Sequence, residues 1–359
     1  MGKVFNVGVI GFGFSAKHFH IPFINAVPEL NLYGVVQKDT DPANHPNRVY
    51  PGVKAYDEVE DLLAAPELDL VIVVTPPNTH FELAKQALEA GKNVVVEKPF
   101  TPTQKEADAL IAIAKKNNLL LTVFQNRRWD SDFATLKKLI EDGALGRVVD
   151  YETHFDRHRP EPPAANSTWK IAVIPGGSAI YDLGPHMIDQ IYHLFGAPKK
   201  VTGFIGVQRS YNPTGYEDSF TVRLEYDNGL VAIARSNCIS PEERQLRFWV
   251  RGEKGSYKKY HLDVQEEQLR AGMLPTDPAY GLEPEERFGV LTCYKDGKIT
   301  GKIHPTINPP PKFITFYAGV AKALAGEAEA PVKAEDAAAV IRIIELAQQS
   351  SKEGRTLDF

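Results

Sequence analysis

The chain has 359 residues, a formal net charge of −5 and 43% hydrophobic residues. This length predicts two domains, and the composition is typical of a globular protein. The acidic balance and the lack of a long basic run argue against a nucleic-acid surface, and no apolar stretch approaches the roughly 18 residues of a membrane span. Cys238 and Cys293 are far apart without metal-type spacing, which predicts free thiols in a reducing compartment. We therefore expect a cytoplasmic protein with neither nucleic acid nor membrane as a partner.

The first third of the chain alternates short apolar runs with helical patterns. Thr103 and Glu106 form a capping-box pattern at the start of one of these helices. The alternation predicts an α/β Rossmann domain over residues 1–124, with a doubly wound parallel sheet. We expect strands over Val4–Ile10, Asn31–Val36, Leu68–Val74, Val94–Val96 and Leu119–Phe124, and helices over Ala16–Ala26, Tyr56–Ala64, Phe81–Ala90 and Thr103–Asn117.

From Gln125 the pattern changes, and strand-like runs dominate. Residues 125–359 therefore predict an α+β domain with a large, mainly antiparallel open sheet, in which Asp227-Asn228-Gly229 marks a hairpin. We expect irregular structure over Arg157–Ser167 and Tyr260–Asn308. The expected helices are Phe133–Asp142, Ile180–Phe195, Pro311–Ala325 and Ala334–Ser351, and the expected strands are Val148–Phe155, Val201–Gln208, Asp218–Tyr226, Leu230–Asn237 and Gln245–Gly252.

A glycine turn follows the first predicted strand. Gly11, Gly13 and Ala16 fit the pattern G-x-G-x-x-G/A: the first permits a tight turn, the second lets a pyrophosphate approach the backbone, and the third lets the helix pack close to the strand. A glycine turn without a ligand is the alternative. We predict that a dinucleotide binds here, on residues Gly11, Phe12, Gly13, Phe14, Ser15 and Ala16.

The residue that ends the second strand selects the cofactor in this fold, because an acid there bonds the ribose of NAD and repels a 2′-phosphate. Gln37 and Lys38 occupy this place and favour NADP. In the alternative, Asp39 is the ribose acid, Lys38 is a surface residue, and the cofactor is NAD. The other candidate cofactor residues in the first domain are Thr75, Pro76, Asn78, Glu97 and His80, although His80 taken alone favours a structural role.

Two further motifs carry a resemblance. Glu97-Lys98-Pro99 follows the strand Val94–Val96, and Tyr181-Asp182-Leu183-Gly184-Pro185-His186 follows a pair of glycines. Together with the glycine turn they resemble the glucose–fructose oxidoreductase / inositol dehydrogenase family over essentially the whole chain. Residues 255–266 are more loosely similar to a subgroup that includes NADP-dependent scyllo-inositol dehydrogenase.

The resemblance implies a nicotinamide enzyme that acts on a sugar or polyol ring. It also implies a homodimer or homotetramer that assembles through the sheet of the second domain. By the same resemblance Lys98 is the active-site lysine, His186 the general base and Asp182 the acid beside them. Gln125, Arg127 and Trp169 fall where the family lines the nicotinamide and the substrate.

The chemistry of alcohol oxidation suits these residues. The cofactor takes the hydride, and the protein must supply a base for the hydroxyl proton, a role that fits an imidazole such as that of His186. Lys98 would stabilise negative charge on the same oxygen. Each residue also has an alternative interpretation. Lys98 could be an ordinary loop lysine, His186 a structural histidine of the helix, and Asp182 a helix cap. Asp182, His186 and Asp189 have a spacing that metal ligands can adopt, but the lysine would repel a metal, so we expect none.

Two other functions remain open on the same fold. One is glycoside cleavage through transient oxidation, in which the nicotinamide is retained between turnovers. The other is a non-catalytic sugar or nucleotide sensor, which would not need a lysine and a histidine together.

Overall fold

The computed structural model describes residues 3–38, 42–161 and 174–359. Its contacts divide the chain into two compact units. The first unit contains residues 1–126, 266–280 and 312–338, and the second contains residues 127–265, 281–311 and 339–359. Two C-terminal segments thus belong to the N-terminal unit. The domain boundary that we expect after residue 124 stays a prediction.

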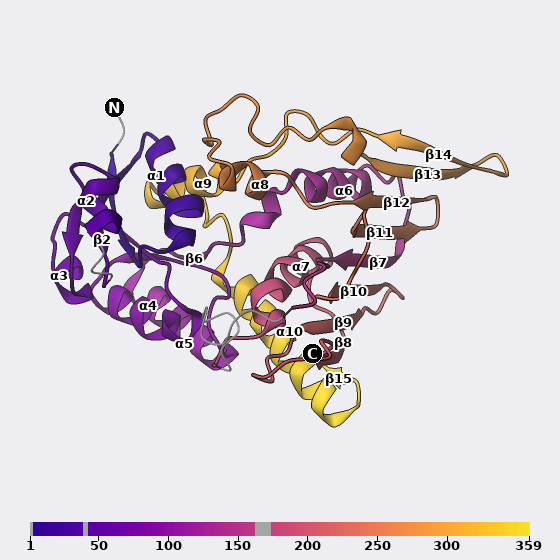
Figure 1. The fold of residues 1–359 in the computed structure, drawn as a ribbon, viewed down its shortest axis with the longest axis horizontal. Helices are drawn as coiled ribbons and strands as arrows, with labels where there is room; N and C mark the ends of the chain where they lie inside the picture. The colour runs from indigo at the N-terminus through magenta and orange to yellow at the C-terminus, as the bar shows by residue number, and fades with distance from the viewer. Residues whose placement is uncertain (1–2, 39–41, 162–173) are drawn as a thin grey trace. The chain divides into compact units, whose positions relative to one another are not determined.

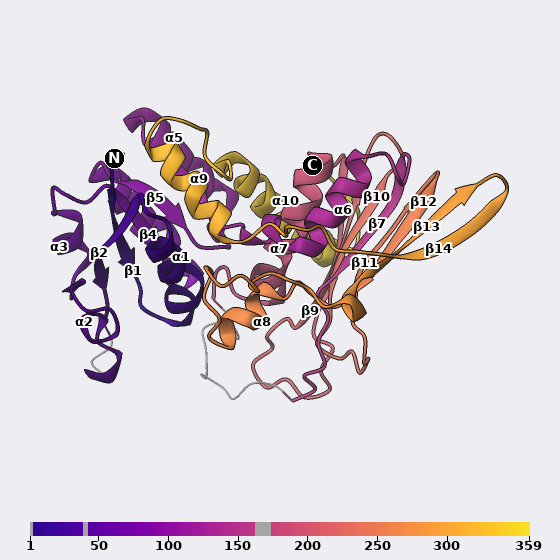
Figure 2. The same cartoon turned by 90° about the horizontal axis from the view of Figure 1, so that it is seen from above.

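The first unit contains a six-stranded sheet in the order β3-β2-β1-β4-β5-β6, and all its neighbouring strands are parallel (Figures 1 and 2; β1, β2, β4 and β5 are labelled in Figure 2). This order reverses direction between β1 and β4, the place where doubly wound folds bind nucleotides. The predicted Rossmann sheet is therefore confirmed. Its strands are β1 (Phe5–Ile10), β2 (Leu30–Val36), β3 (Lys54–Tyr56), β4 (Leu70–Val73), β5 (Asn93–Val96) and β6 (Leu121–Val123).

The helices of this unit mostly follow the predicted pattern. The helix after the glycine turn begins as a π-helical segment, Ala16–His20, before it continues as α1 (Ile21–Ala26). The capping box of α5 is confirmed. The helix expected from Tyr56 is wrong at its start, because β3 takes Lys54–Tyr56 and α3 begins at Val59. The remaining helices are α2 (Pro46–Val49), α3 (Val59–Leu63), α4 (His80–Glu89), α5 (Gln104–Asn117), α8 (Gln265–Arg270, beginning one residue before this unit) and α9 (Ile314–Leu324), with short 3-10 turns at Pro42–Asn44 and Pro77–Thr79.

The second unit contains a nine-stranded sheet in the order β14-β13-β12-β11-β7-β10-β9-β8-β15 (Figure 1). Its only parallel pair among the described residues is β7 with β10, so the predicted mainly antiparallel sheet is confirmed. The hairpin signal also holds, because β9 and β10 are antiparallel and Gly229 has a φ of 81°. The strands are β7 (Val148–His154), β8 (Lys200–Gly206), β9 (Ser219–Glu225), β10 (Val231–Ser236), β11 (Leu246–Gly252), β12 (Gly255–Tyr260), β13 (Gly289–Lys295), β14 (Lys298–His304) and β15 (Leu357–Asp358).

The irregular stretch that we expected over Tyr260–Asn308 is wrong. It contains the hairpin of β13 and β14 as well as all of α8. β14 is an edge strand whose residues are almost all exposed, and its sequence, Lys-Ile-Thr-Gly-Lys-Ile-His, contains no apolar run. Edge strands carry such charged and small residues because these discourage pairing with other chains.

Helices pack on the second sheet and fix its geometry. They are α6 (Ser131–Glu141), α7 (Ala179–Phe195) and α10 (Ala334–Glu353), with 3-10 turns at Asn126–Trp129 and Glu285–Arg287. α7 packs against β9 and β10. At Gly203 of β8 an added Cβ would lie 2.0 Å from the carbonyl oxygen of Ala347, so α10 reaches this strand only because the residue is glycine. Within the described ranges, no helix combines the length and the apolar character that a membrane crossing requires.

Candidate functional site

The strand ends of the parallel sheet bring several predicted residues to one edge. The Gly11 amide donates to the carbonyl of Val36, and the Val74 amide donates to the carbonyl of Ile10, at 3.1 and 2.9 Å. The Glu97 amide donates to the carbonyl of Val73 at 2.9 Å. The glycine turn, the loop that begins at Thr75 and the Glu97-Lys98 segment therefore follow one another along the carboxyl edge, where doubly wound sheets bind ligands.

The glycine turn has the geometry that a pyrophosphate needs. Gly11 has a φ of 100°, and a Cβ there would lie 2.5 Å from the carbonyl oxygen of Val74, so only glycine fits. A Cβ on Gly13 would meet nothing within 4 Å, which leaves its backbone open to a ligand. Ala16 is fully buried. These three observations fit a bound dinucleotide.

Ser15 joins the glycine turn to the end of β5. Its hydroxyl does not cap the helix but donates to Glu97 Oε1 at 2.8 Å. The other carboxylate oxygen, Oε2, is buried and has no hydrogen-bond partner among the residues that the structure describes. Burial opposes ionisation of Glu97, but the hydrogen bond and charge of His20, the charge of Lys98 and the hydrogen bond from Ser15 together lower the pKa of this carboxyl. A buried acceptor without a donor is a place where a ligand would bind favourably.

The loop after β4 is held by His80. Its Nε2 lies 2.9 Å from the carbonyl oxygen of Thr75, and its Nδ1 lies 2.8 Å from that of Pro99. Burial lowers the pKa of His80, although these backbone hydrogen bonds oppose the shift. His80 thus links the Thr75 loop to the segment after Lys98, and a direct contact of His80 with the cofactor stays a prediction. Pro76 and Asn78 lie in the same loop, where Thr79 Oγ1 donates to the Pro76 carbonyl at 2.7 Å.

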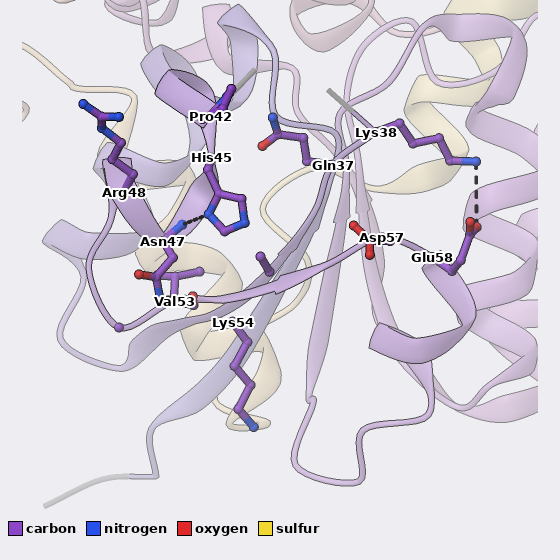
Figure 3. A pocket seen from close by; sticks show the side chains of 12 residues that line it. Gln37, Lys38, Pro42, His45, Asn47, Arg48, Val53, Lys54, Asp57 and Glu58 are labelled. Carbon is purple, nitrogen blue, oxygen red and sulfur yellow. Dashed lines mark hydrogen bonds and ion pairs between the residues drawn. The ribbon is translucent and has the colours of Figure 1, made fainter. Parts of the chain in front are cut away.

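A cavity of about 1130 Å³ opens beside the end of β2 (Figure 3). Gln37 and Lys38 line it. The Lys38 ammonium lies 3.8 Å from a carboxylate oxygen of Glu58, and both side chains are largely exposed, so this pair is weak and is readily exchanged for a ligand. The cavity lies where the selecting residue of the cofactor was expected. Asp39, the alternative ribose acid, lies outside the described residues.

Helix α7 of the second unit carries Asp182 and His186. His186 is 8% exposed, and its ring stacks on that of Phe155 with the centroids 6.4 Å apart. Asp182, one turn earlier, is half-buried. The start of the helix is fixed by the Ala179 amide, which donates to the carbonyl of Glu217 at 3.0 Å.

The turn before α6 is tied to α7 by contacts that the sequence did not predict. Arg128 makes two hydrogen bonds with Asp189, at 2.7 and 2.8 Å, and both side chains are buried. Gln190 donates to the carbonyl of Arg127 at 2.7 Å and accepts from Arg247 at 2.9 Å. Asp189 lies three residues after His186, and its spacing from Asp182 and His186 was the available signal in the sequence. Nothing local to Arg247 indicates its role.

The structure brings part of the predicted site together. The candidates from Gly11 to Gln125 lie in the first unit, together with Lys98, which is partly exposed and precedes a cis peptide bond to Pro99. Asp182, His186 and Arg127 lie in the second unit, so their meeting with Lys98 at one substrate stays a prediction. Trp169 lies outside the described residues. Over residues 3–38, 42–161 and 174–359, no group of three His, Cys, Asp or Glu side chains could hold a metal ion.

Comparisons with known proteins agree with this arrangement. Residues 5–125 match the profile of an oxidoreductase family, NAD-binding Rossmann fold, and residues 137–359 match the C-terminal alpha/beta domain of the same family. The chain is 37% identical to scyllo-inositol 2-dehydrogenase (NADP+) IolW of Bacillus subtilis over 98% of this chain and 95% of that protein. It is 38% identical to the uncharacterized oxidoreductase YdgJ of Escherichia coli, with 99% of each chain covered. The solved structure of yvaA from Bacillus subtilis superposes with a TM-score of 0.93 at 36% identity, with 99% of each chain covered.

Proposed function

Because the chain belongs to the Gfo/Idh/MocA oxidoreductase family, we propose that it transfers a hydride between a nicotinamide cofactor and a secondary alcohol of a sugar, inositol or related polyol. The observation that carries the proposal is the carboxyl edge of the parallel sheet, where Glu97 and Lys98 directly follow β5 beside the glycine turn. The identity with an inositol dehydrogenase over nearly the full chain supports a polyol as the substrate class.

The chain's own residues would hold and move the alcohol proton. The bound nicotinamide supplies the hydride acceptor. In the proposed reaction His186 takes the hydroxyl proton, and Lys98 donates a hydrogen bond to the same oxygen and stabilises its developing negative charge. Asp182, one helical turn before His186, orients the imidazole. The glycine turn holds the pyrophosphate, and the open space at Gly13 leaves room for it.

The proposed dehydrogenase activity is tested by assaying the protein with a panel of inositols, aldoses and 1,2-diols. We expect NADPH formation, followed by absorbance at the reduced nicotinamide band, with at least one polyol of the panel. Lys98→Ala is expected to abolish this activity. If wild type and variant are equally inactive on every member, the dehydrogenase proposal fails and a sensor becomes the better account.

We further propose NADP as the preferred cofactor, which rests on Gln37 and Lys38 beside the cavity at the end of β2. Gln37→Asp is expected to shift the ratio of kcat/KM for NADP over NAD toward NAD by about tenfold or more, because the new carboxylate repels a 2′-phosphate and bonds a ribose hydroxyl. Steady-state kinetics with both cofactors measure the ratio. Gln37→Asn keeps the charge and serves as the control, and an unchanged ratio in Gln37→Asp would show that this position does not select.

We also propose that the protein associates with further copies of itself through the sheet of the second unit. Val290, Tyr294, Ile299 and Ile303 lie on one face of the β13–β14 hairpin, because Val290 pairs with Ile303 and Tyr294 with Ile299. Their exposed fractions run from 39% to 75%. Such an apolar row on an open sheet favours a second copy of this chain as its partner. Light scattering coupled to size exclusion measures whether the protein is a dimer or a tetramer.

A further inference from the structure

A buried chain of hydrogen bonds in the first unit ends on Glu97. His20, which is fully buried, lies between two partners: its Nδ1 is 2.5 Å from the Tyr317 hydroxyl and its Nε2 is 3.5 Å from Glu97 Oε1. The same Oε1 accepts the Ser15 hydroxyl at 2.8 Å. Tyr317 is also fully buried and comes from α9, 297 residues further along the chain. No sequence motif assigns a role to His20 or to Tyr317.

The direction of the hydrogen bonds follows from the groups. An ionised carboxylate only accepts, so Nε2 of His20 must carry the hydrogen that faces Glu97. The second ring nitrogen, Nδ1, shares its hydrogen bond with the Tyr317 hydroxyl. Burial, with a smaller contribution from the charge of Glu97, raises the pKa of Tyr317 well above its ordinary value, so this hydroxyl keeps its proton. Tyr317, His20 and Glu97 therefore form one continuous chain of hydrogen bonds.

Aromatic packing keeps this chain rigid. The His20 ring lies 4.4 Å from that of Phe124, centroid to centroid. The Tyr317 ring is nearly parallel to that of Phe23, at an interplanar angle of 11° and a distance of 6.3 Å. Phe316 packs edge-on against Phe124 at 5.0 Å. Rings held in this way leave little freedom for His20, so Glu97 Oε1 has a fixed donor.

The two carboxylate oxygens of Glu97 differ in their hydrogen bonds. Oε1 receives both donors, whereas Oε2 is buried and has no hydrogen-bond partner within the described part of the chain. Glu97 lies at the carboxyl edge of the sheet, next to Lys98 and bonded to the glycine turn. A buried carboxylate oxygen without a donor costs free energy, and a donor from a bound ligand removes that cost.

We propose that His20 and Tyr317 are positioning residues that hold the Glu97 carboxylate in one orientation, so that Oε2 accepts a hydrogen bond from the bound nicotinamide cofactor. This inference rests on the proposed cofactor site. It assigns a binding task to the side chain of Glu97 and makes the C-terminal segment that carries Tyr317 part of the cofactor site.

The test is a fluorescence titration of the purified protein with NADPH, run beside a thermal melt. His20→Leu keeps an apolar body but removes both ring nitrogens, and we expect the dissociation constant to rise about tenfold. Tyr317→Phe removes only the far hydroxyl, and we expect a rise of about threefold. His20→Gln offers an amide N–H in place of Nε2 and is expected to restore the affinity to within about twofold of wild type.

Thr122→Val is the matched control, because Thr122 is equally buried in the same unit and donates to the carbonyl of Val332 at 2.7 Å without touching Glu97. It should lower the melting temperature but leave the dissociation constant within about twofold of wild type. A folded His20→Leu protein that binds NADPH as wild type does overturns the inference, and so does a Thr122→Val protein that loses as much affinity as His20→Leu. If His20→Leu does not fold, an unchanged affinity in Tyr317→Phe overturns it. A wild-type protein that binds neither NADPH nor NADH would instead refute the cofactor site itself.

Discussion

Replacing His186 with asparagine is expected to lower kcat for polyol oxidation by about a thousandfold, the usual range for loss of a general base. Asparagine cannot take the hydroxyl proton, although it fits the helix and keeps a polar group against Phe155. The KM for the cofactor and the melting temperature should change little, because the glycine turn belongs to the first unit and His186 belongs to the second. Steady-state kinetics under saturating cofactor measure the effect.

His193 provides the control on the same helix. It lies two turns beyond His186 and contacts Lys137 Nζ at 3.0 Å. His193→Asn should keep wild-type kcat. The double variant Lys98→Met/His186→Asn should be little slower than either single variant, because two groups that act on one proton transfer are not additive. Retention of more than a tenth of kcat in His186→Asn would exclude His186 as the base.

Replacing Arg247 with methionine is expected to destabilise the protein by about 3–5 kcal/mol, the usual cost of breaking a buried ion pair. The Arg247 guanidinium is 1% exposed and donates to Asp132 at 2.9 Å and to Thr153 at 2.7 Å. It also lies 3.8 Å from Asp130. Burial raises the pKa of Asp130 well above its ordinary value, and removing Arg247 takes away a charge that opposes this rise. Urea unfolding at pH 7 measures the loss.

The pH dependence of this variant has a definite sign. Burial already raises the pKa of Asp130 in the folded wild-type protein, and without the opposing charge of Arg247 the pKa of this carboxyl rises further. As the pH falls from 7 toward the unfolded pKa near 4, the stability of the variant should then rise more than that of the wild type, so the deficit should narrow. Arg147→Met is the control, since the Arg147–Glu253 pair is about half exposed on both sides and contributes at most about 1 kcal/mol. If Arg247→Met and Arg147→Met lost equal free energies of unfolding, the structural role inferred for Arg247 would be wrong.

Arg247 also connects stability to the candidate site. Its guanidinium holds Gln190, whose amide in turn holds the carbonyl of Arg127. Gln190 lies one turn beyond His186 on α7. The buried charges around α6 therefore hold α7, the helix that carries the candidate base His186. We expect a loss of packing there to lower the activity before the protein unfolds.

The Rossmann unit was predictable because its information is local. Valine-rich runs such as Val94–Val96 are buried on both faces, and each ends at a residue with a clear chemical character, such as Gly11 or Glu97. A parallel sheet then brings these ends to one edge by geometry alone. The candidate cofactor residues could thus be proposed from the sequence, and the structure shows the strand ends that carry them along one edge.

The side-chain contacts that support the candidate residues join segments that are far apart in the sequence. Such contacts leave no pattern in either segment. His20 and Tyr317 are 297 residues apart, and Arg247 and Asp132 are 115 apart. Each of these residues looks like an ordinary helix or strand residue in its own segment. The β13–β14 hairpin was missed for another reason: an edge strand buries little, so β14 has no apolar run to reveal it.

Hydride transfer itself is tested most directly with a polyol deuterated at its carbinol carbons. The best substrate of the panel, labelled in this way, is oxidised with unlabelled NADP, and the reduced cofactor is isolated for mass spectrometry. If the hydride passes directly from the polyol to the cofactor, we expect one deuterium on the nicotinamide ring for each molecule of polyol oxidised. Reduced cofactor without deuterium, or release of the label to solvent, would contradict it.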